Sequence, residues 1–416
     1  MKNRCFSLLA LLAVMLSVGR LWADELPVQW DMDKLSVAPA WQPLPSMDDE
    51  NVHAVLIEGP AYKGEATRFF AFYALPEGAD AQHPVPAMVL VHGGGGTAFA
   101  SWVKEWVARG YAAIALDTTG RIPLPLPGDP FAMNYNNWAL LPGGIHLDWG
   151  GYERAMRAVD EQWPYCALCE VIIAHTFLRN IEGVDNDRIG ITGNSWGGFL
   201  TLLAAAVDTR YKMAAPLYAS GFYEDFPQLA AKPSEELKRW CELWDPSHYV
   251  TSIHIPMLWY GGATDVAFDY GCVQKTLAIC SSPFLCVSSR PDVIHIDGGY
   301  EPGRPAEVYD FAEQFLKHPE GTFPQVEMER KRHNRAVAYV HANGFKMESA
   351  ELFYTTDSEN PWSKKEWRGQ AVKYKPGQEK VTFDIPKEAR YCFLGVYTDE
   401  GRIMSSRLVE CERNEP

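Results

Sequence analysis

The chain has 416 residues, and its 53 acidic residues outnumber its 38 basic ones, giving a formal net charge of −15 at pH 7. The basic residues are scattered, so this charge excludes nucleic acid and anionic membrane surfaces as expected partners. The length allows one large α/β domain and a smaller second domain.

The first residues have the pattern of a secretory signal peptide. Lys2 and Arg4 precede an apolar run over residues 6–18, and Ala23 supplies a small residue at its exit. The run is too short for a stable membrane span. We therefore expect residues 1–23 to be removed and the mature protein to be exported, periplasmic or secreted, without a membrane span.

Export would make the remaining cysteines potential disulfide partners. Cys166 and Cys169 begin a helical pattern, without the preceding strand of a redox motif and without a second pair at zinc-ligand spacing. No metal and no organic cofactor are therefore expected. Cys272, Cys280 and Cys286 lie near one another in the sequence, which fits either one structural disulfide or buried free thiols.

After a Pro- and Trp-rich segment over residues 26–47, which we expect to be extended, the apolar residues follow strand patterns. Alternation over residues 52–57 and 67–75 predicts two antiparallel opening strands. Helical patterns or long loops separate the later runs, which is typical of a mostly parallel, doubly wound α/β sheet. The six apolar runs cover residues 85–91, 111–116, 188–192, 213–217, 255–260 and 284–287.

The run that ends at Thr192 leads into Gly-Asn-Ser-Trp-Gly and then a helical pattern, so Ser195 stands on a sharp turn between a strand and a helix. Glycines at 193 and 197 keep the crossing clear and leave the Ser195 hydroxyl at the tip of the turn. The backbone N–H of Trp196, at the start of the helix, points at any oxyanion formed there. This pattern predicts a nucleophilic serine.

A second glycine-rich loop follows the run over residues 85–91. It reads His92 and then four glycines, so its backbone can approach a ligand closely. In hydrolases such a loop supplies the other half of an oxyanion hole, here from an N–H near Gly94. We expect His92 to support the loop rather than to react.

A reactive serine needs a histidine base and a carboxylate that orients it. Asp265 follows the strand predicted over residues 255–260, and His295 lies between the last sheet strand and a final helix over residues 306–317. This reproduces the chain order serine, acid, histidine. Asp292 and Asp297 flank His295 and are the alternative acids, but neither follows a strand of its own.

With these motifs, residues 51 to about 317 resemble the α/β-hydrolase superfamily, nearest to dienelactone-hydrolase-like and acetylxylan-esterase-like enzymes and to the catalytic domain of the prolyl oligopeptidase family. The resemblance implies catalytic Ser195, Asp265 and His295, with oxyanion N–H groups from Trp196 and Gly94. The chain has no room for the N-terminal propeller of the peptidases, which usually carry another residue at the position of Asn194.

Two aromatic-rich insertions, residues 118–151 and 220–250, follow strands at the carboxyl edge of the sheet, where ligands bind in such folds. We interpret them as walls of a substrate pocket suited to sugar rings. The predicted substrate-binding residues are Trp138, Trp149, Tyr223 and Trp244.

From about residue 321 the chain changes to short alternating runs separated by turns, which predicts a small all-β, sandwich-like accessory domain over residues 321–416. Its predicted strands cover residues 336–340, 351–355, 380–385, 389–397 and 403–409. The catalytic α/β-hydrolase domain would then cover residues 24–320 and contain every predicted catalytic group.

These features predict an exported serine hydrolase, an esterase acting on acylated carbohydrate or a related small ester through an acyl-enzyme. One alternative is a serine peptidase similar to prolyl oligopeptidase. A second is a non-catalytic binding protein that keeps the hydrolase fold.

Overall fold

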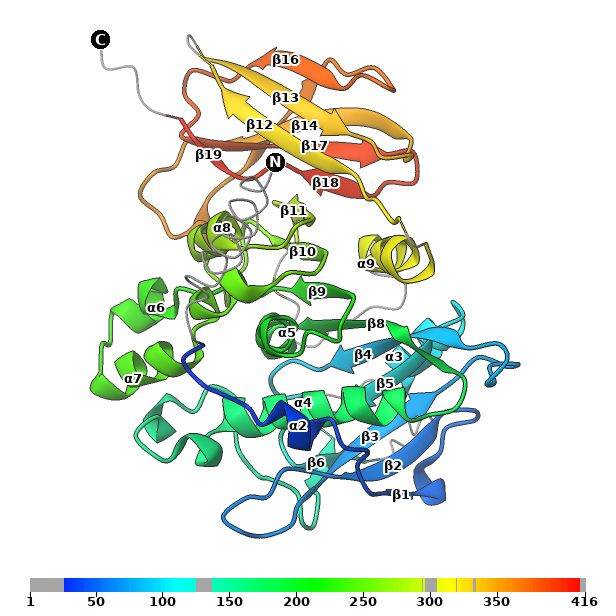
Figure 1. Ribbon diagram of the computed structural model, residues 1–416. Helices are drawn as coiled ribbons and strands as arrows, with labels where there is room; N and C mark the ends of the chain where they lie inside the picture. The colour runs from blue at the N-terminus through cyan, green and yellow to red at the C-terminus, as the bar shows by residue number, and fades with distance from the viewer. Residues whose placement is uncertain are drawn as a thin grey trace, which may run out of the picture.

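The computed structural model describes residues 26–124, 137–293, 295, 305–318, 320–331 and 334–411. The predicted signal peptide and Asp297 lie outside these residues. Within them, a large mixed sheet forms the centre of the molecule and smaller sheets lie at the C-terminal end (Figure 1). None of the described helices is long and apolar enough to cross a membrane.

The large sheet has nine strands, and the predicted parallel arrangement is confirmed. In spatial order the strands are β1 (Trp41–Pro43), β2 (His53–Glu58), β3 (Arg68–Ala74), β5 (Ala112–Leu116), β4 (Val85–Val91), β8 (Val184–Asn194), β9 (Met213–Leu217), β10 (Met257–Gly262) and β11 (Leu285–Arg290). Neighbouring strands from β1 to β5 in this order pair antiparallel, and neighbouring strands from β5 to β11 pair parallel.

Helices cover both faces of this sheet (Figure 1). On one face lie α4 (Trp163–Arg179) and α5 (Trp196–Val207), which pack against each other. On the other lie α3 (Ala100–Val107) and α9 (Ala306–Ala312), joined by a contact between the rings of Trp106 and Tyr309 at 4.8 Å. A π-helical turn, Glu313–Lys317, continues α9 and completes the predicted final helix.

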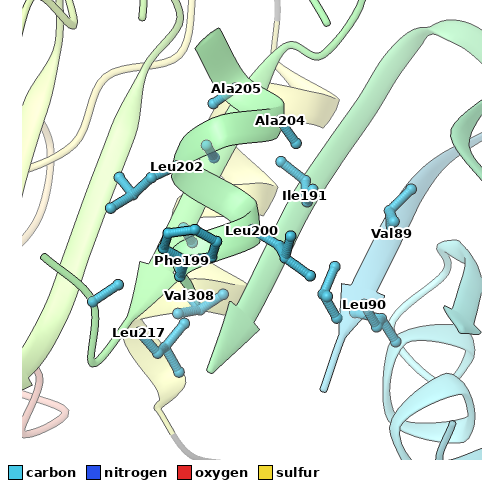
Figure 2. Close-up of a cluster of buried hydrophobic side chains, with 14 of the residues drawn as sticks. Val89, Leu90, Ile191, Phe199, Leu200, Leu202, Ala204, Ala205, Leu217 and Val308 are labelled. Atoms are coloured by element: carbon cyan, nitrogen blue, oxygen red, sulfur yellow. The ribbon is translucent and has the colours of Figure 1, made fainter. Parts of the chain in front are cut away.

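The core between sheet and helices is densely apolar, because parallel strands are buried on both faces and carry few polar residues. In Figure 2, Phe199, Leu200 and Leu202 of α5 lie in one apolar cluster with Ile191 and Leu217 of the adjacent strands β8 and β9. Phe199 and Leu200 are fully buried. This packing fixes the start of α5, and therefore the turn that precedes it.

Beyond the sheet, several short elements build the edge at which the strands end. One of them is a two-stranded antiparallel sheet in which β6 (Arg121–Pro123) pairs with β7 (Trp138–Leu140). The insertion after β9 forms a 3-10 turn (Tyr223–Asp225), α6 (Pro227–Ala230) and α7 (Glu235–Trp244), and α8 (Tyr270–Ile279) follows β10. In the N-terminal segment, which we expected to be extended, the structure adds the single turn α2 (Met32–Leu35) and β1.

The C-terminal residues form two antiparallel sheets that share one apolar core. The predicted strand over residues 403–409 is split into two short strands, and two strands that we did not predict appear, β12 and β15. One sheet contains β12 (Gln325–Arg330), β13 (Arg335–His341) and β16 (Lys380–Asp384). The other contains β15 (Arg368–Val372), β14 (Met347–Thr355), β17 (Tyr391–Thr398), β18 (Ile403–Ser405) and β19 (Val409–Glu410).

These sheets pack directly on β11 and α8. The Ser289 N–H of β11 donates to Ser405 Oγ at 2.9 Å, and Ser405 Oγ donates to the Val287 carbonyl at 3.3 Å. Trp259 and Phe393 belong to one apolar cluster that spans the contact. The C-terminal sheets therefore support the two strands, β10 and β11, that lead to Asp265 and His295.

Candidate active site

Ser195 lies on the turn between β8 and α5 with φ 56° and ψ −121°, a left-handed conformation that side chains rarely adopt. The backbone of the predicted sharp turn is therefore strained at Ser195. Glycine is required two residues before and two residues after Ser195, because a Cβ on Gly197 would collide with the Val91 carbonyl oxygen, and one on Gly193 would lie 2.5 Å from the Gly197 oxygen. The tight crossing leaves the hydroxyl of Ser195 in a cavity beside the sheet.

The loop over residues 92–96 lies directly against this turn. A Cβ on Gly93 would be 3.1 Å from the Ser195 Cβ, and one on Gly94 would be 2.9 Å from Cδ1 of Trp196. The backbone of the loop therefore lies close to the turn that carries Ser195. The role of its N–H groups in an oxyanion hole stays a prediction. Gly95 has φ +77°, which favours glycine.

His92 holds this loop in place, as expected. Its Nε2 accepts a hydrogen bond from the Thr118 N–H at 3.1 Å, so the proton is on Nδ1, which donates to the Gly93 carbonyl at 2.7 Å. Burial lowers the pKa of His92 below its usual value. A neutral ring that bridges two loops is a structural support for the glycine backbone.

Asp265 and His295 meet at the same edge of the sheet. Asp265 Oδ2 lies 3.1 Å from His295 Nδ1, and Asp265 Oδ1 accepts hydrogen bonds from the N–H groups of Ala267 and Phe268 at 2.7 and 2.9 Å. Both residues are buried, with 4% of Asp265 and 9% of His295 exposed. Asp292, the alternative acid that the structure describes, is exposed on its loop.

Aromatic rings hold the imidazole of His295 from two sides. The ring of Tyr218 meets it edge-on at 5.4 Å, and the ring of Phe268 stacks on it at 5.8 Å. Tyr218, like Ser195, has a left-handed backbone, with φ 52°. The ring contacts and the carboxylate leave the imidazole little freedom to turn.

Ser195 and His295 line one cavity of about 630 Å³, with Gly94 and Gly95 at its wall. Six aromatic residues contribute to the described lining: Trp149, Tyr152, Trp196, Tyr223, Phe226 and Phe268. Trp149 packs its ring on Gly94, and the ring centroids of Trp149 and Trp196 lie 5.5 Å apart.

Of the four aromatic residues predicted to bind substrate, the structure places two at the cavity and two elsewhere. Trp149 and Tyr223 line it. Trp244 is fully buried and its Nε1 donates to Gln162 Oε1 at 2.8 Å, because α7 turns this face toward the core. Trp138 lies on β7, outside the described lining, under the guanidinium of Arg121. The prediction for Trp244 and Trp138 is corrected accordingly.

Sequence reasoning did not single out six other residues of the described cavity wall. Ala267 and Phe268 come two and three residues after Asp265, and their distance in sequence from Ser195 gave no sign of the contact. Tyr152 comes directly after the first aromatic-rich insertion, and Phe226, Gln228 and Leu229 belong to the second, but no pattern distinguished them from their neighbours.

None of the eight cysteines in the described residues lines the cavity. All eight cysteines from Cys166 to Cys411 are free thiols, so the structure favours the second of the two interpretations of Cys272, Cys280 and Cys286. Burial raises the pKa of Cys169 to about 12. Within the described ranges, no group of three or more His, Cys, Asp or Glu side chains could hold a metal ion.

Comparisons with known proteins agree with this geometry. The acetyl xylan esterase (AXE1) family model matches residues 46–267, a range that includes Ser195 and Asp265 and ends before His295. The solved acetyl xylan esterase from Paenibacillus sp. R4 has a TM-score of 0.52 and 20% identity, over 70% of this chain and 96% of that one. This likeness shows the α/β-hydrolase fold.

Curated relatives include two peptidases. Probable dipeptidyl-peptidase 5 from Aspergillus flavus and dipeptidyl-peptidase 5 from Aspergillus oryzae are each 25% identical over 241 residues, or 56% of this chain. The match covers 27% of either protein, so the chain spans about a quarter of the length of these relatives.

Proposed function

Since the chain belongs to the acetyl xylan esterase (AXE1) family and is a carboxylic ester hydrolase, we propose that it is an exported serine esterase that removes acyl groups from carbohydrate or a related small ester. One observation carries the mechanism. Ser195, on its strained turn, shares a cavity with His295, whose Nδ1 lies 3.1 Å from Asp265.

In this mechanism the Ser195 hydroxyl attacks the ester carbonyl carbon and passes its proton to Nε2 of His295. The N–H groups of Trp196 and Gly94 stabilise the oxyanion. His295 then protonates the departing alcohol, leaving an acyl-serine that water cleaves in the same way. Asp265, held by two backbone N–H groups, keeps the proton on Nδ1 and stabilises the imidazolium.

A peptidase activity is the second candidate, because the curated relatives are peptidases. A dipeptidyl-peptidase must hold the free amine of its substrate, for which a carboxylate near the serine is the natural partner. Among the described residues that line the cavity there is no Asp or Glu. This favours the esterase over the peptidase.

Export is supported by the charged and apolar pattern of residues 1–23. The negative net charge is compatible with a small-molecule or carbohydrate ester as the substrate.

The two activities are separated by assaying 4-nitrophenyl acetate beside an aminoacyl 4-nitroanilide, with fluorophosphonate labelling in parallel. We expect turnover of the acetate, little or none of the anilide, and a label on Ser195 found by peptide mapping. Faster turnover of the anilide would establish the peptidase. Turnover of neither substrate, with no label, would support a non-catalytic binding protein.

A further inference from the structure

The cavity beside Ser195 is far larger than an acetyl group requires. Its volume is about 630 Å³, whereas a two-carbon acyl group fills roughly the space of two water molecules, about 60 Å³. Cavities of this size usually enclose a ring system or a larger ligand. An acetyl group alone would leave most of the apolar wall in contact with water.

The inner wall is made of three aromatic side chains. Tyr223, Phe226 and Phe268 are 1%, 2% and 3% exposed, so they are buried apart from the faces that line the cavity. The rings of Tyr223 and Phe226 stack at 4.6 Å, and Phe268 meets both edge-on at 6.3 and 6.1 Å. Since Phe268 also stacks on His295, this wall begins at the predicted base.

The outer wall continues the same chemistry. Trp149 is 43% exposed and lies over Gly94, beside Trp196. A flat group that entered between the two walls would lie against ring faces and edges, which is the arrangement that aromatic pairs prefer.

The low polarity of the wall favours an aromatic ring over a sugar ring as the bound group. In the described lining, His295 is the only side chain that can carry a positive charge and no carboxylate is present. Several sugar hydroxyls would each lose water there and need a hydrogen-bond partner in return. The one side-chain amide in the described lining belongs to Gln228, which is an exposed residue, whereas the three aromatic residues of the inner wall are buried.

We propose that this cavity binds an aromatic ring carried by the ester substrate, so that the preferred substrates are aryl-bearing esters rather than simple acetates. This rests on the proposed esterase function and narrows it. The ring lies against Tyr223, Phe226 and Phe268 while the ester carbonyl faces Ser195 and the N–H groups of Trp196 and Gly94.

The test compares four esters, with each rate divided by the ester's own rate of hydrolysis by hydroxide. Methyl cinnamate carries the ring on its acyl part, benzyl acetate carries it on its alcohol part, and ethyl acetate and xylose tetraacetate carry none. We expect kcat/KM for at least one ring-bearing ester to exceed that for ethyl acetate by about tenfold or more, because the ring buries apolar surface. The better of the two shows which part of the ester occupies the cavity.

A variant that fills the cavity tests the location. Leu229→Trp places a larger side chain on α6 at the wall, and we expect the ratio of kcat/KM for the better ring-bearing ester to that for ethyl acetate to fall at least fivefold. Ile279→Trp makes a similar change at a 38%-exposed position on α8, outside the cavity lining, and should leave the ratio unchanged.

Equal or better turnover of ethyl acetate or xylose tetraacetate overturns the ring preference while leaving the esterase function in place. The proposal is also overturned if Leu229→Trp has an unaltered thermal melt and leaves the ratio of the two kcat/KM values unchanged. Failure to hydrolyse any of the four esters would instead overturn the proposed function.

A separate observation concerns the C-terminal sheets. Cys392 on β17 and Cys411, directly after β19, have their sulfur atoms 3.5 Å apart, and both are buried. The two strands are paired, with Cys392 opposite Val409, and the Cys411 N–H donates to the Arg390 carbonyl at 2.7 Å. The backbone therefore already holds these thiols together.

From this contact we infer that Cys392 and Cys411 form a disulfide under oxidising conditions, closing the chain over 19 positions. One thiolate attacks a small disulfide such as oxidised glutathione and releases one glutathione thiol. The other cysteine then displaces the second glutathione thiol, so the two cysteines lose two electrons and two protons in all. The sulfur atoms need to approach to about 2.05 Å.

The full chain, incubated with oxidised glutathione and digested without reductant, should yield a peptide containing Cys392 linked to one containing Cys411. Cys392→Ser should lose this linked peptide, and Cys280→Ser, which changes a free thiol elsewhere, should keep it. Glutathione adducts without the linked peptide, or linkage of Cys411 to another cysteine, would overturn the inference. Because the first result uses the unaltered chain, it does not depend on the folding of either variant.

Discussion

Ser195→Ala is expected to lower kcat for 4-nitrophenyl acetate by several powers of ten, as the loss of a nucleophile does in other serine hydrolases. The fold should survive, since alanine occupies the same left-handed backbone position as serine and removes only a hydroxyl. The measurement is steady-state kinetics beside a thermal melt of the same preparation. Fluorophosphonate labelling should disappear together with the activity.

Ser288→Ala is the matched control, because Ser288 is a buried serine on β11 that lies outside the cavity lining. It should retain the activity and the label. If Ser195→Ala kept substantial activity, or if the label appeared on another serine, the assignment of the nucleophile would be wrong.

His295→Ala should cost about as much as the loss of Ser195, because members of such a triad act as a unit. Asp265→Asn should be milder by roughly one to two powers of ten, since the oxyanion hole and substrate binding survive. Its effect should still be large, because an amide at this position no longer stabilises the imidazolium. The comparison needs kcat for all three variants with one small ester.

Two further substitutions test the choice of acid. Asp292→Asn changes an exposed carboxylate near His295, and Asp297→Asn changes the other alternative. Both should keep activity near that of the unaltered protein. Severe loss in either, together with a mild Asp265→Asn, would move the role of the acid to that residue.

Much of the catalytic half could be predicted because its signals are local. A buried parallel strand is a short apolar run, and β4 and β9 match their predicted runs, 85–91 and 213–217. The position of Asp265 and His295 after their strands also follows from chain order. Since parallel strands end at one edge of the sheet, order along the chain is enough to bring these side chains together.

What could not be predicted depends on contacts between distant segments. Trp244 and Trp149 both lie in aromatic-rich insertions, but the packing of α7 on the core buries Trp244, whereas Trp149 stays at the surface beside Gly94. The last predicted strand is split because Ser405 turns its hydroxyl to β11 and the Ser406 N–H donates to the Leu394 carbonyl. Composition and periodicity contain no information on such pairings.

The position of Ser405 has a consequence for association between molecules. β11 is the outermost strand of the nine-stranded sheet, with β10 as its strand neighbour. An uncovered outer strand offers unpaired N–H and C=O groups to which a strand of another copy can add, and such addition leads to aggregation. Here Ser405 Oγ accepts a hydrogen bond from the Ser289 N–H and donates one to the Val287 carbonyl, and β18 lies alongside β11 (Figure 1). The C-terminal sheets thereby close the β11 edge of the nine-stranded sheet to strand addition.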